Sequence, residues 1–416
     1  MTALKLLGRM LRLRKILRIK RFMFCQRDRQ IDIWVKPYRN GRRCPECGRQ
    51  GRIVRTMPET RRWRDVRVCG MDVYLLYQPR EIVCPTHGRR QEAIPWAAPS
   101  AQVTYRLEYL VLRYCQAMCQ KDAAQLLHMS PSTLSGILHR SITRIRDGHR
   151  IHGLKTVGID EISYRRGKRY ATIVYDLNRG RVVWVQEGKA RESINHFFER
   201  CLTGFQRSQI RFACCDMSKA YIGAVKQWCP HARLVLDRFH IVKALNEAVD
   251  EVRKQQWREL KGSVEGTAVK GLRWLLFRHS SNRTPSQTRI LKQLRKSNRR
   301  IWRAWQLKDE FERFWQYRYP GAARTFVQRW TTSALKSRLQ PLRKFVNTLR
   351  NHFDDVLTFI DTHLTNATSE GINRLLRIVK NRASGFSHLD AFADIIYLVA
   401  GEVDIPDCIA AVFHTA

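Results

Sequence analysis

The stretch from Thr156 to Asp237 constrains the fold more than any other part of the chain, because it alternates strand-like and helix-like segments in a definite order. Runs of apolar and β-branched residues predict strands, and apolar residues at helical spacing predict helices. The strands are expected at 156–160, 168–176, 181–186, 210–216 and 233–237, and the helices at 194–202 and 218–228. A mixed five-stranded sheet with helices packed on it is therefore the expected α/β core.

Three strands, a helix, a strand, a helix and a strand are the element order of the RNase H-like fold, in which the first and fourth strands lie side by side. Asp160 ends the first strand and Asp216 ends the fourth, so we expect their carboxylates to meet at one edge of the sheet. Glu370 begins the helical segment 369–376 and is expected to join them. Three carboxylates suit a pair of magnesium ions, for which manganese can substitute, in phosphodiester chemistry. Asp160, Asp216 and Glu370 are therefore the candidate catalytic residues and magnesium ligands.

Charged residues near these acids each have two interpretations. Asp237 and His240 are accessory candidates, and Asp237 is either a fourth ligand or, as we prefer, the N-cap of a helix. Arg374, Arg377 and Lys380 follow Glu370 at spacings that place them near its face of the helix. These three cations are expected to contact DNA at the scissile phosphate; a solvated basic face is the alternative.

Four potential zinc ligands occur as two pairs, Cys44 with Cys47 and Cys84 with His87. The members of each pair are three positions apart, and a glycine follows the second member, which permits a tight turn. Three thiolates and one imidazole make a closed tetrahedral set suited to structural zinc. The alternating residues between the pairs predict a small β-rich zinc ribbon; two unrelated turns are the alternative.

A helix-turn-helix pattern follows the zinc ligands. Residues 121–127 predict a short helix, residues 128–130 a turn, and residues 131–138 a second helix with Pro131 at its first position. The second helix would present its exposed side chains to the major groove of DNA. The candidate DNA contacts are Ser132, Thr133, Ser135, His139 and Arg140. An ordinary helical hairpin is the alternative interpretation.

The charge of the chain points to a polyanionic partner. The formal net charge is +41, from 77 Lys and Arg against 36 Asp and Glu. The segment Leu4–Phe22 is basic and amphipathic, which favours a soluble helix or an arm; an organelle-targeting helix is the alternative. Its arginines interrupt the apolar centre that a signal peptide needs. No apolar run is long enough to predict a membrane span. Scattered cysteines fit a reducing interior better than a disulfide framework.

The region after Asp237 is helical, basic and rich in tryptophan. We expect most of its tryptophans to fill a helical core, although interleaved aromatic and basic residues can also stack on nucleic-acid bases. The expected division of the chain has six parts. They are a basic arm or strand (1–40), a zinc ribbon (41–100), a helix-turn-helix domain (101–150), the first part of the catalytic core (151–250), a helical insertion (251–360) and C-terminal core helices (361–416).

Together these segments resemble the DDE transposases of bacterial insertion sequences, most closely the ISL-three family. Besides the zinc ligands and the helix-turn-helix, the resemblance rests on five motifs. They are Gly158-Ile159-Asp160-Glu161, Asp216-Met217-Ser218-Lys219-Ala220-Tyr221, Asp237-Arg238-Phe239-His240, Ser369-Glu370-Gly371-Ile372-Asn373 and Lys380-Asn381-Arg382-Ala383-Ser384-Gly385-Phe386. The basic N-terminal segment is not covered by the resemblance.

The resemblance implies a DDE triad at Asp160, Asp216 and Glu370. It further implies action on double-stranded DNA, namely the element's terminal inverted repeats and a target, as a homo-oligomer in the bacterial cytoplasm and nucleoid. The alternative is a catalytically silent or domesticated transposase that regulates by binding DNA. The intact acids favour activity over that alternative. A ribonuclease H or junction nuclease of the same fold is disfavoured, because a zinc ribbon and a helix-turn-helix suit duplex DNA.

Overall fold

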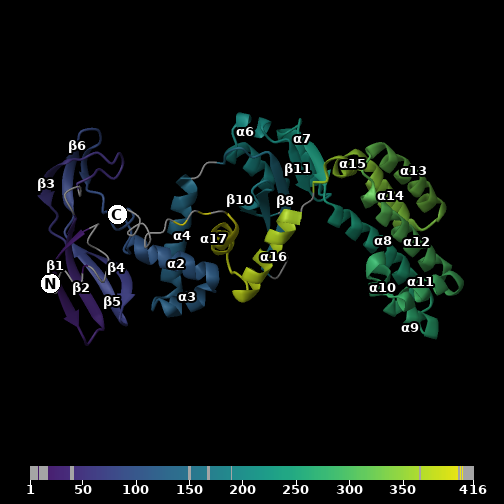
Figure 1. Ribbon diagram of the computed structural model, residues 1–416, viewed down its shortest axis with the longest axis horizontal. Helices are drawn as coiled ribbons and strands as arrows, with labels where there is room; N and C mark the ends of the chain where they lie inside the picture. Colours follow the sequence, from purple (N-terminus) through teal and green to yellow (C-terminus); the bar gives the residue numbers. More distant parts are fainter. Residues whose placement is uncertain are drawn as a thin grey trace. The chain divides into compact units, whose positions relative to one another are not determined.

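The computed structural model describes residues 17–37, 42–148, 151–165, 169–188, 190–364 and 367–401, together with residues 8, 403 and 405 (Figure 1). The chain divides into two compact units. The first comprises residues 1–150 and 378–416, and the second comprises residues 151–377. The division falls within one helix, α16 (Ala367–Arg382).

The described residues of the first unit include two small β-sheets. Their strands are β1 (Leu17–Cys25), β2 (Gln30–Pro37), β3 (Arg52–Thr56), β4 (Arg61–Val68), β5 (Met71–Tyr77), β6 (Arg80–Cys84) and β7 (Gly88–Gln91). One sheet has the order β1-β2-β5-β4, and the other has the order β3-β6-β7. Alternate residues of β2 and β5, such as Ile31, Ile33, Val73 and Leu75, are buried with Trp63 in the core of the larger sheet.

Strand β1 corrects our expectation of a helix or an arm near the N-terminus. Residues 17–25 pair antiparallel with β2, and the register shifts between Ile19 and Arg21. Such a bulge interrupts the strict alternation of apolar and basic residues by which a strand is recognised, so the pattern resembled an amphipathic helix. The part of Leu4–Phe22 before Leu17, apart from Gly8, lies outside the described residues.

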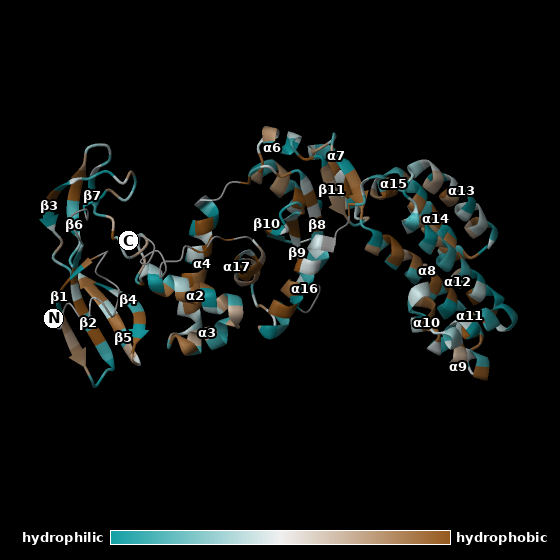
Figure 2. Ribbon diagram, in the orientation of Figure 1, coloured by the Kyte–Doolittle hydropathy of each residue, from teal (hydrophilic) through white to brown (hydrophobic). Residues whose placement is uncertain are grey.

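The described part of the first unit also contains the helices α2 (Tyr105–Ala117), α3 (Gln120–Leu126), α4 (Pro131–Gly148) and α17 (Leu389–Ala400), together with the end of α16. Helices α3 and α4 form the predicted helix-turn-helix, and the Ser130 hydroxyl caps α4 by accepting a 3.1 Å hydrogen bond from the Thr133 amide. Helix α17 packs against α2 and α4. Figure 2 shows α17 mostly in the hydrophobic colour, which agrees with the burial of Phe392, Ile395 and Ile396.

The second unit contains the predicted five-stranded sheet. Its strands are β8 (Thr156–Arg165), β9 (Arg169–Asp176), β10 (Arg181–Glu187), β11 (Phe212–Cys215) and β12 (Arg233–Leu236). Their order is β10-β9-β8-β11-β12, with β8, β11 and β12 parallel and the other pairs antiparallel. The first and fourth strands are therefore neighbours, which confirms the RNase H-like arrangement. The helices between β10 and β12 are α5 (Arg191–His196), a π-helix η1 (Phe197–Cys201), α6 (Gly204–Ser208) and α7 (Lys219–Trp228).

A long helical insertion follows β12 and precedes α16. Its helices are α8 (Arg238–Glu259), α9 (Val264–Gly271), α10 (Arg273–Phe277), η2 (Ser280–Asn282), α11 (Pro285–Ser297), α12 (Arg299–Phe311), η3 (Glu312–Gln316), α13 (Pro320–Lys336), α14 (Gln340–Asn351) and α15 (Phe353–Thr362). The core of the insertion is continuous with that of the sheet. Trp305, Trp315 and Trp330 are buried in it, as expected, whereas Trp274 on α10 is 71% exposed.

No helix in the described part of the chain is both long enough and apolar enough to cross a membrane.

Candidate active site and metal centre

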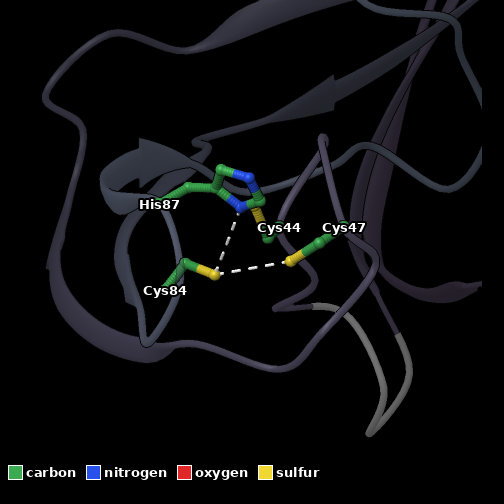
Figure 3. Close-up of side chains that lie close together, drawn as sticks. All are labelled: Cys44, Cys47, Cys84 and His87. Atoms are coloured by element: carbon green, nitrogen blue, oxygen red, sulfur yellow. Dashed lines mark hydrogen bonds between the residues drawn. The ribbon is translucent and has the colours of Figure 1, made fainter.

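The four predicted zinc ligands lie together in the first unit (Figure 3). Cys44 and Cys47 come from the turn before β3, Cys84 ends β6, and His87 precedes β7. The Sγ atoms of Cys47 and Cys84 are 3.5 Å apart, and the Nδ1 atom of His87 lies 3.8 Å from Cys44 Sγ and 3.9 Å from Cys84 Sγ. These separations match the edges of a tetrahedron with Zn–S bonds of about 2.3 Å, which are roughly 3.8 Å long.

The backbone around the four ligands favours metal binding in two ways. Gly48 and Gly88 follow the second ligand of each pair with φ values of +68° and +67°, a conformation that glycine adopts without strain. Burial alone would raise the pKa of the Cys84 thiol, but hydrogen bonds from the backbone of His87 and Thr86 outweigh it and hold this pKa at about 6. A thiol with a lowered pKa readily becomes the thiolate that binds zinc.

Three acids lie on or just after neighbouring parallel strands of the second unit. Asp160 was expected to end the first strand, but β8 continues to Arg165 and Asp160 lies within it, whereas Asp216 and Asp237 follow β11 and β12. Gly158 pairs with Cys214, so Asp160 and Asp216 each lie two residues beyond a paired position of β8 and β11. Cys215 pairs with Leu236, so Asp216 and Asp237 stand at equivalent positions after β11 and β12. The sheet register therefore brings Asp160, Asp216 and Asp237 to one edge of the five-stranded sheet. We call these three residues the acidic edge.

Asp160 is held by two hydrogen bonds. The side-chain amide of Asn373 donates to its Oδ2 over 2.7 Å, and the backbone amide of Glu161 donates to its Oδ1 over 2.7 Å. Tyr175, buried on β9, donates in turn to Oδ1 of Asn373 over 2.6 Å. Burial raises the pKa of Asp160 to about 6 against the opposing effect of the Glu161 amide, and the charges of Asp216 and Asp237 also raise it.

Asp216 and Asp237 each accept a hydrogen bond from the helix that follows them. The Ser218 amide donates to Asp216 and the Phe239 amide donates to Asp237, both over 2.9 Å. Asp237 thus caps α8, the role we preferred, yet it is also part of the acidic edge. Its Oδ2 lies 3.9 Å from Nε2 of His240.

Glu370 is exposed in the first turns of α16 and lies within the electrostatic influence of this edge. Burial raises the pKa of Glu370, the charge of Asp237 raises it further, and His240 and Arg377 oppose the increase. The carboxylates of Asp160, Asp216 and Glu370 are not all within 4.8 Å of one another. Within the described ranges, only Cys44, Cys47, Cys84 and His87 form a group of three or more ligands that meets this limit.

The basic residues of α16 have distinct environments. Arg374 and Arg377 are exposed, and Lys380 is half-buried. Arg377 donates through Nε to the backbone oxygen of Asn373 over 3.2 Å. Asn373 is a functional residue that the sequence did not reveal: it stands in the motif that contains Glu370, but only the fold shows that its amide reaches Asp160.

On α4, Ser132, Thr133, His139 and Arg140 are exposed, and Ser135 is half-buried. The hydroxyls of Ser132 and Thr133 join the cap of α4, because Ser130 Oγ lies 2.9 Å and 2.8 Å from them. His139 Nδ1 lies 3.0 Å from Oδ2 of Asp394 on α17, a partner that the sequence did not predict.

Three family models match successive parts of the chain. A zinc-finger model of the transposases IS204, IS1001, IS1096 and IS1165 matches residues 41–87, and the helix-turn-helix model of transposase family ISL3 matches residues 92–142. The ISL3 DDE transposase model matches residues 157–396, which is more than half of the 416 residues.

Individual relatives agree with these matches. The chain is 29% identical over 370 residues to the transposase for insertion sequence element IS1001 of Bordetella parapertussis, covering 88% of this chain and 90% of the relative. It is 26% identical over 369 residues to the transposase for IS1557 of Mycobacterium tuberculosis, covering 83% and 82%. The Drosophila P element transposase strand transfer complex aligns with a TM-score of 0.40 at 9% identity, over 72% of this chain and 92% of that one. The chain belongs to the ISL3 family of DDE transposases.

Proposed function

We propose that this transposase cuts and joins DNA at the terminal inverted repeats of its own insertion sequence, with Asp160, Asp216 and Glu370 as the catalytic acids. The observation that supports the proposal is the register of β8 and β11, in which Asp160 and Asp216 each follow the paired residues Gly158 and Cys214 by two positions. The family match supports the reaction class, and the first turns of α16 supply the third acid.

The acids fit a hard divalent cation by the chemistry of their donors. Magnesium prefers oxygen ligands. The carboxylates of the acidic edge, which come from adjacent strands, supply only oxygen atoms. Asp160, Asp216 and Glu370 would hold the ions, with Asp237 and His240 as accessory groups. When bound, magnesium or manganese activates the attacking oxygen and stabilises the leaving oxygen in phosphoryl transfer.

The protein's own residues orient this chemistry. The Asn373 amide fixes one oxygen of Asp160, so the carboxylate keeps a single orientation at the sheet edge. The exposed cations Arg374 and Arg377 lie on the same helix as Glu370, where they can hold the scissile phosphate. Ser132, Thr133, Ser135, His139 and Arg140 on α4 are proposed to contact the terminal repeat, with the copies of the protein assembled as a homo-oligomer on bacterial chromosomal DNA.

The test is nicking of duplex DNA that carries the ends flanking the gene, with magnesium, manganese or neither. Cleavage at the ends that requires the metal is the expected result. Asp216→Cys should then lose most activity with magnesium and regain part of it with manganese, because a thiolate binds the softer ion better. Tight binding of the ends without cleavage under any metal would instead establish the alternative, a DNA-binding regulator.

A further inference from the structure

The helical insertion contains a long segment in which every Asp, Glu, Lys or Arg residue is a Lys or Arg. Residues 266–308 include twelve Lys and Arg and no Asp or Glu. Acids from outside the segment neutralise part of this charge. Arg300 lies 3.1 Å from Glu259, Lys308 lies 2.9 Å from Glu312, Arg273 lies 3.7 Å from Asp250, and Arg283 pairs with Asp309. The remaining cations need a different explanation.

Three of them form one exposed stripe along α11. Arg289, Lys292 and Lys296 are at positions i, i+3 and i+7, which places them within about 60° of one another around the helix axis. Leu291 and Leu294 are buried on the opposite side. In the part of the chain that the structure describes, no carboxylate lies within ion-pair distance of these three cations.

Arg299 continues the stripe at the start of α12. The buried Asn298 fixes this corner, because its Oδ1 accepts from the Ile301 amide over 3.0 Å and its Nδ2 donates to Gln256 over 3.1 Å. Arg299 is exposed in the first turn of α12, which has no acidic residue, so its charge faces the positive end of the helix dipole. It also lies three residues from Lys296. A cation at the positive end of the helix dipole and near Lys296 lowers the stability of the protein without DNA. The stability of the fold therefore does not explain why these cations occur together.

We propose that this basic corner, consisting of Arg289, Lys292, Lys296 and Arg299, binds the sugar-phosphate backbone of duplex DNA. The proposal rests on the proposed function, which makes DNA the substrate, and it adds a contact surface outside the helix-turn-helix and the acidic edge. A polyanion with regularly spaced phosphates removes the repulsion among these cations and releases its own counterions on binding.

The neighbouring side chains favour duplex over single-stranded DNA. Binding of a single strand commonly uses open aromatic rings on which bases stack. Trp302, the ring adjacent to the corner, is half-buried and covered by the Arg295 guanidinium, 5.3 Å from its centre. Long cationic side chains that are not part of a helix-turn-helix or a similar base-reading motif suit contacts to phosphates rather than to base edges.

The test compares two full-length variants that lose the same charge. In the corner variant, Lys292→Gln, Lys296→Gln and Arg299→Gln remove three unpaired cations. In the control, Arg233→Gln, Arg258→Gln and Arg324→Gln remove three exposed cations that pair with Asp361, Glu251 and Asp354. Affinity for a duplex of random sequence is measured over a series of salt concentrations. The corner variant should lower the slope of log affinity against log salt by about 2 to 3, at roughly 0.9 per phosphate contact, and the control should leave it unchanged.

An unchanged slope in the corner variant, or equal changes in both variants, would overturn the proposal. Acylation of lysines in the unmodified protein gives a second measurement that needs no variant: duplex DNA should protect Lys292 and Lys296 but not the exposed Lys344 on α14. Absence of this protection would also overturn it. Failure of the wild type to cut its ends, with protection intact, would contradict the proposed catalytic function and leave the basic corner standing.

Discussion

The side-chain amide of Asn373 donates a 2.7 Å hydrogen bond to Asp160, and it thereby links α16, which carries Glu370, to the central strand β8. Oδ1 of the same Asn373 side chain accepts a hydrogen bond from Tyr175 on β9. Because Asn373 and Tyr175 are both buried, this chain of hydrogen bonds sets the orientation of the Asp160 carboxylate.

Asn373→Ala should weaken the apparent magnesium affinity in end cleavage by about 10- to 100-fold, the usual effect of removing a group that orients a metal ligand. The measurement is the cleavage rate over a magnesium titration. Binding of the DNA ends should be unchanged, because Asn373 is buried and Asp160 keeps its charge.

Tyr175→Phe is a milder variant whose magnesium affinity can be compared with that of Asn373→Ala. It removes only the hydroxyl that orients Asn373, so its metal affinity should fall between those of the wild type and Asn373→Ala. A normal magnesium dependence in both variants, even with a lowered melting temperature, would show that the pair stabilises the fold without positioning Asp160.

Cys84→Ser should reduce bound zinc and unfold the module around β3, β6 and β7, because it removes one of four ligands from a closed site. The measurements are the zinc content of the purified protein and proteolysis of residues 41–87. Cys69→Ser is the matched control, since Cys69 is exposed and outside the ligand group. Full zinc content in Cys84→Ser would refute the assignment.

His139→Gln should destabilise the helix-turn-helix by about 1–3 kcal/mol, because Asp394 is buried and would lose its partner. Thermal or denaturant unfolding measures this loss. Asp394→Asn distinguishes stability from DNA recognition. If His139 also contacts the terminal repeat, His139→Gln should weaken binding of the DNA ends more than Asp394→Asn does. Equal losses of binding in the two variants would show that His139 serves only to pack α4 against α17.

Lys308→Met should destabilise the insertion by about 3–5 kcal/mol, because Lys308 is 2% exposed and its removal takes away the nearer basic partner of Glu312, at 2.9 Å, and leaves His279 at 3.4 Å. Burial raises the pKa of Glu312, but the hydrogen bond and charge of Lys308 outweigh burial and lower it below the ordinary 4.5. The stability from this pair is therefore present above about pH 4.5 and is lost as the pH falls.

Denaturant unfolding at several pH values checks this prediction. Adding Glu312→Gln to Lys308→Met should recover much of the lost stability, because the double variant no longer buries an unpaired charge. Equal stabilities of the single and double variants would show that the two residues are not coupled.

The parts of the structure that the sequence predicted are those with local signals. The zinc ligands are paired within short turns, and Asp160 and Asp216 stand at the ends of apolar runs whose order implies their adjacency. The helix-turn-helix was predictable because Ser130 and Pro131 mark the start of its second helix.

The parts that were missed depend on contacts between distant segments. Nothing near His139 in the sequence indicates that Asp394 is its partner, and nothing near Asn373 indicates that it reaches Asp160. Strand β1 was missed because the bulge after Ile19 disturbs its alternation. The sequence also did not predict that the carboxylates of Asp160, Asp216 and Glu370 would not all lie within 4.8 Å of one another.

The joint action of Asp160, Asp216 and Glu370 on DNA is the proposal on which the catalytic function depends. Its most direct test is end cleavage by the wild type and by Asp160→Asn, Asp216→Asn and Glu370→Gln, which keep side-chain size and remove one charge each. Each variant should bind the ends as the wild type does and cleave at least about a thousandfold more slowly, because several kcal/mol of transition-state stabilisation are lost. Wild-type cleavage by Glu370→Gln would contradict the account, since the third acid would then lie elsewhere.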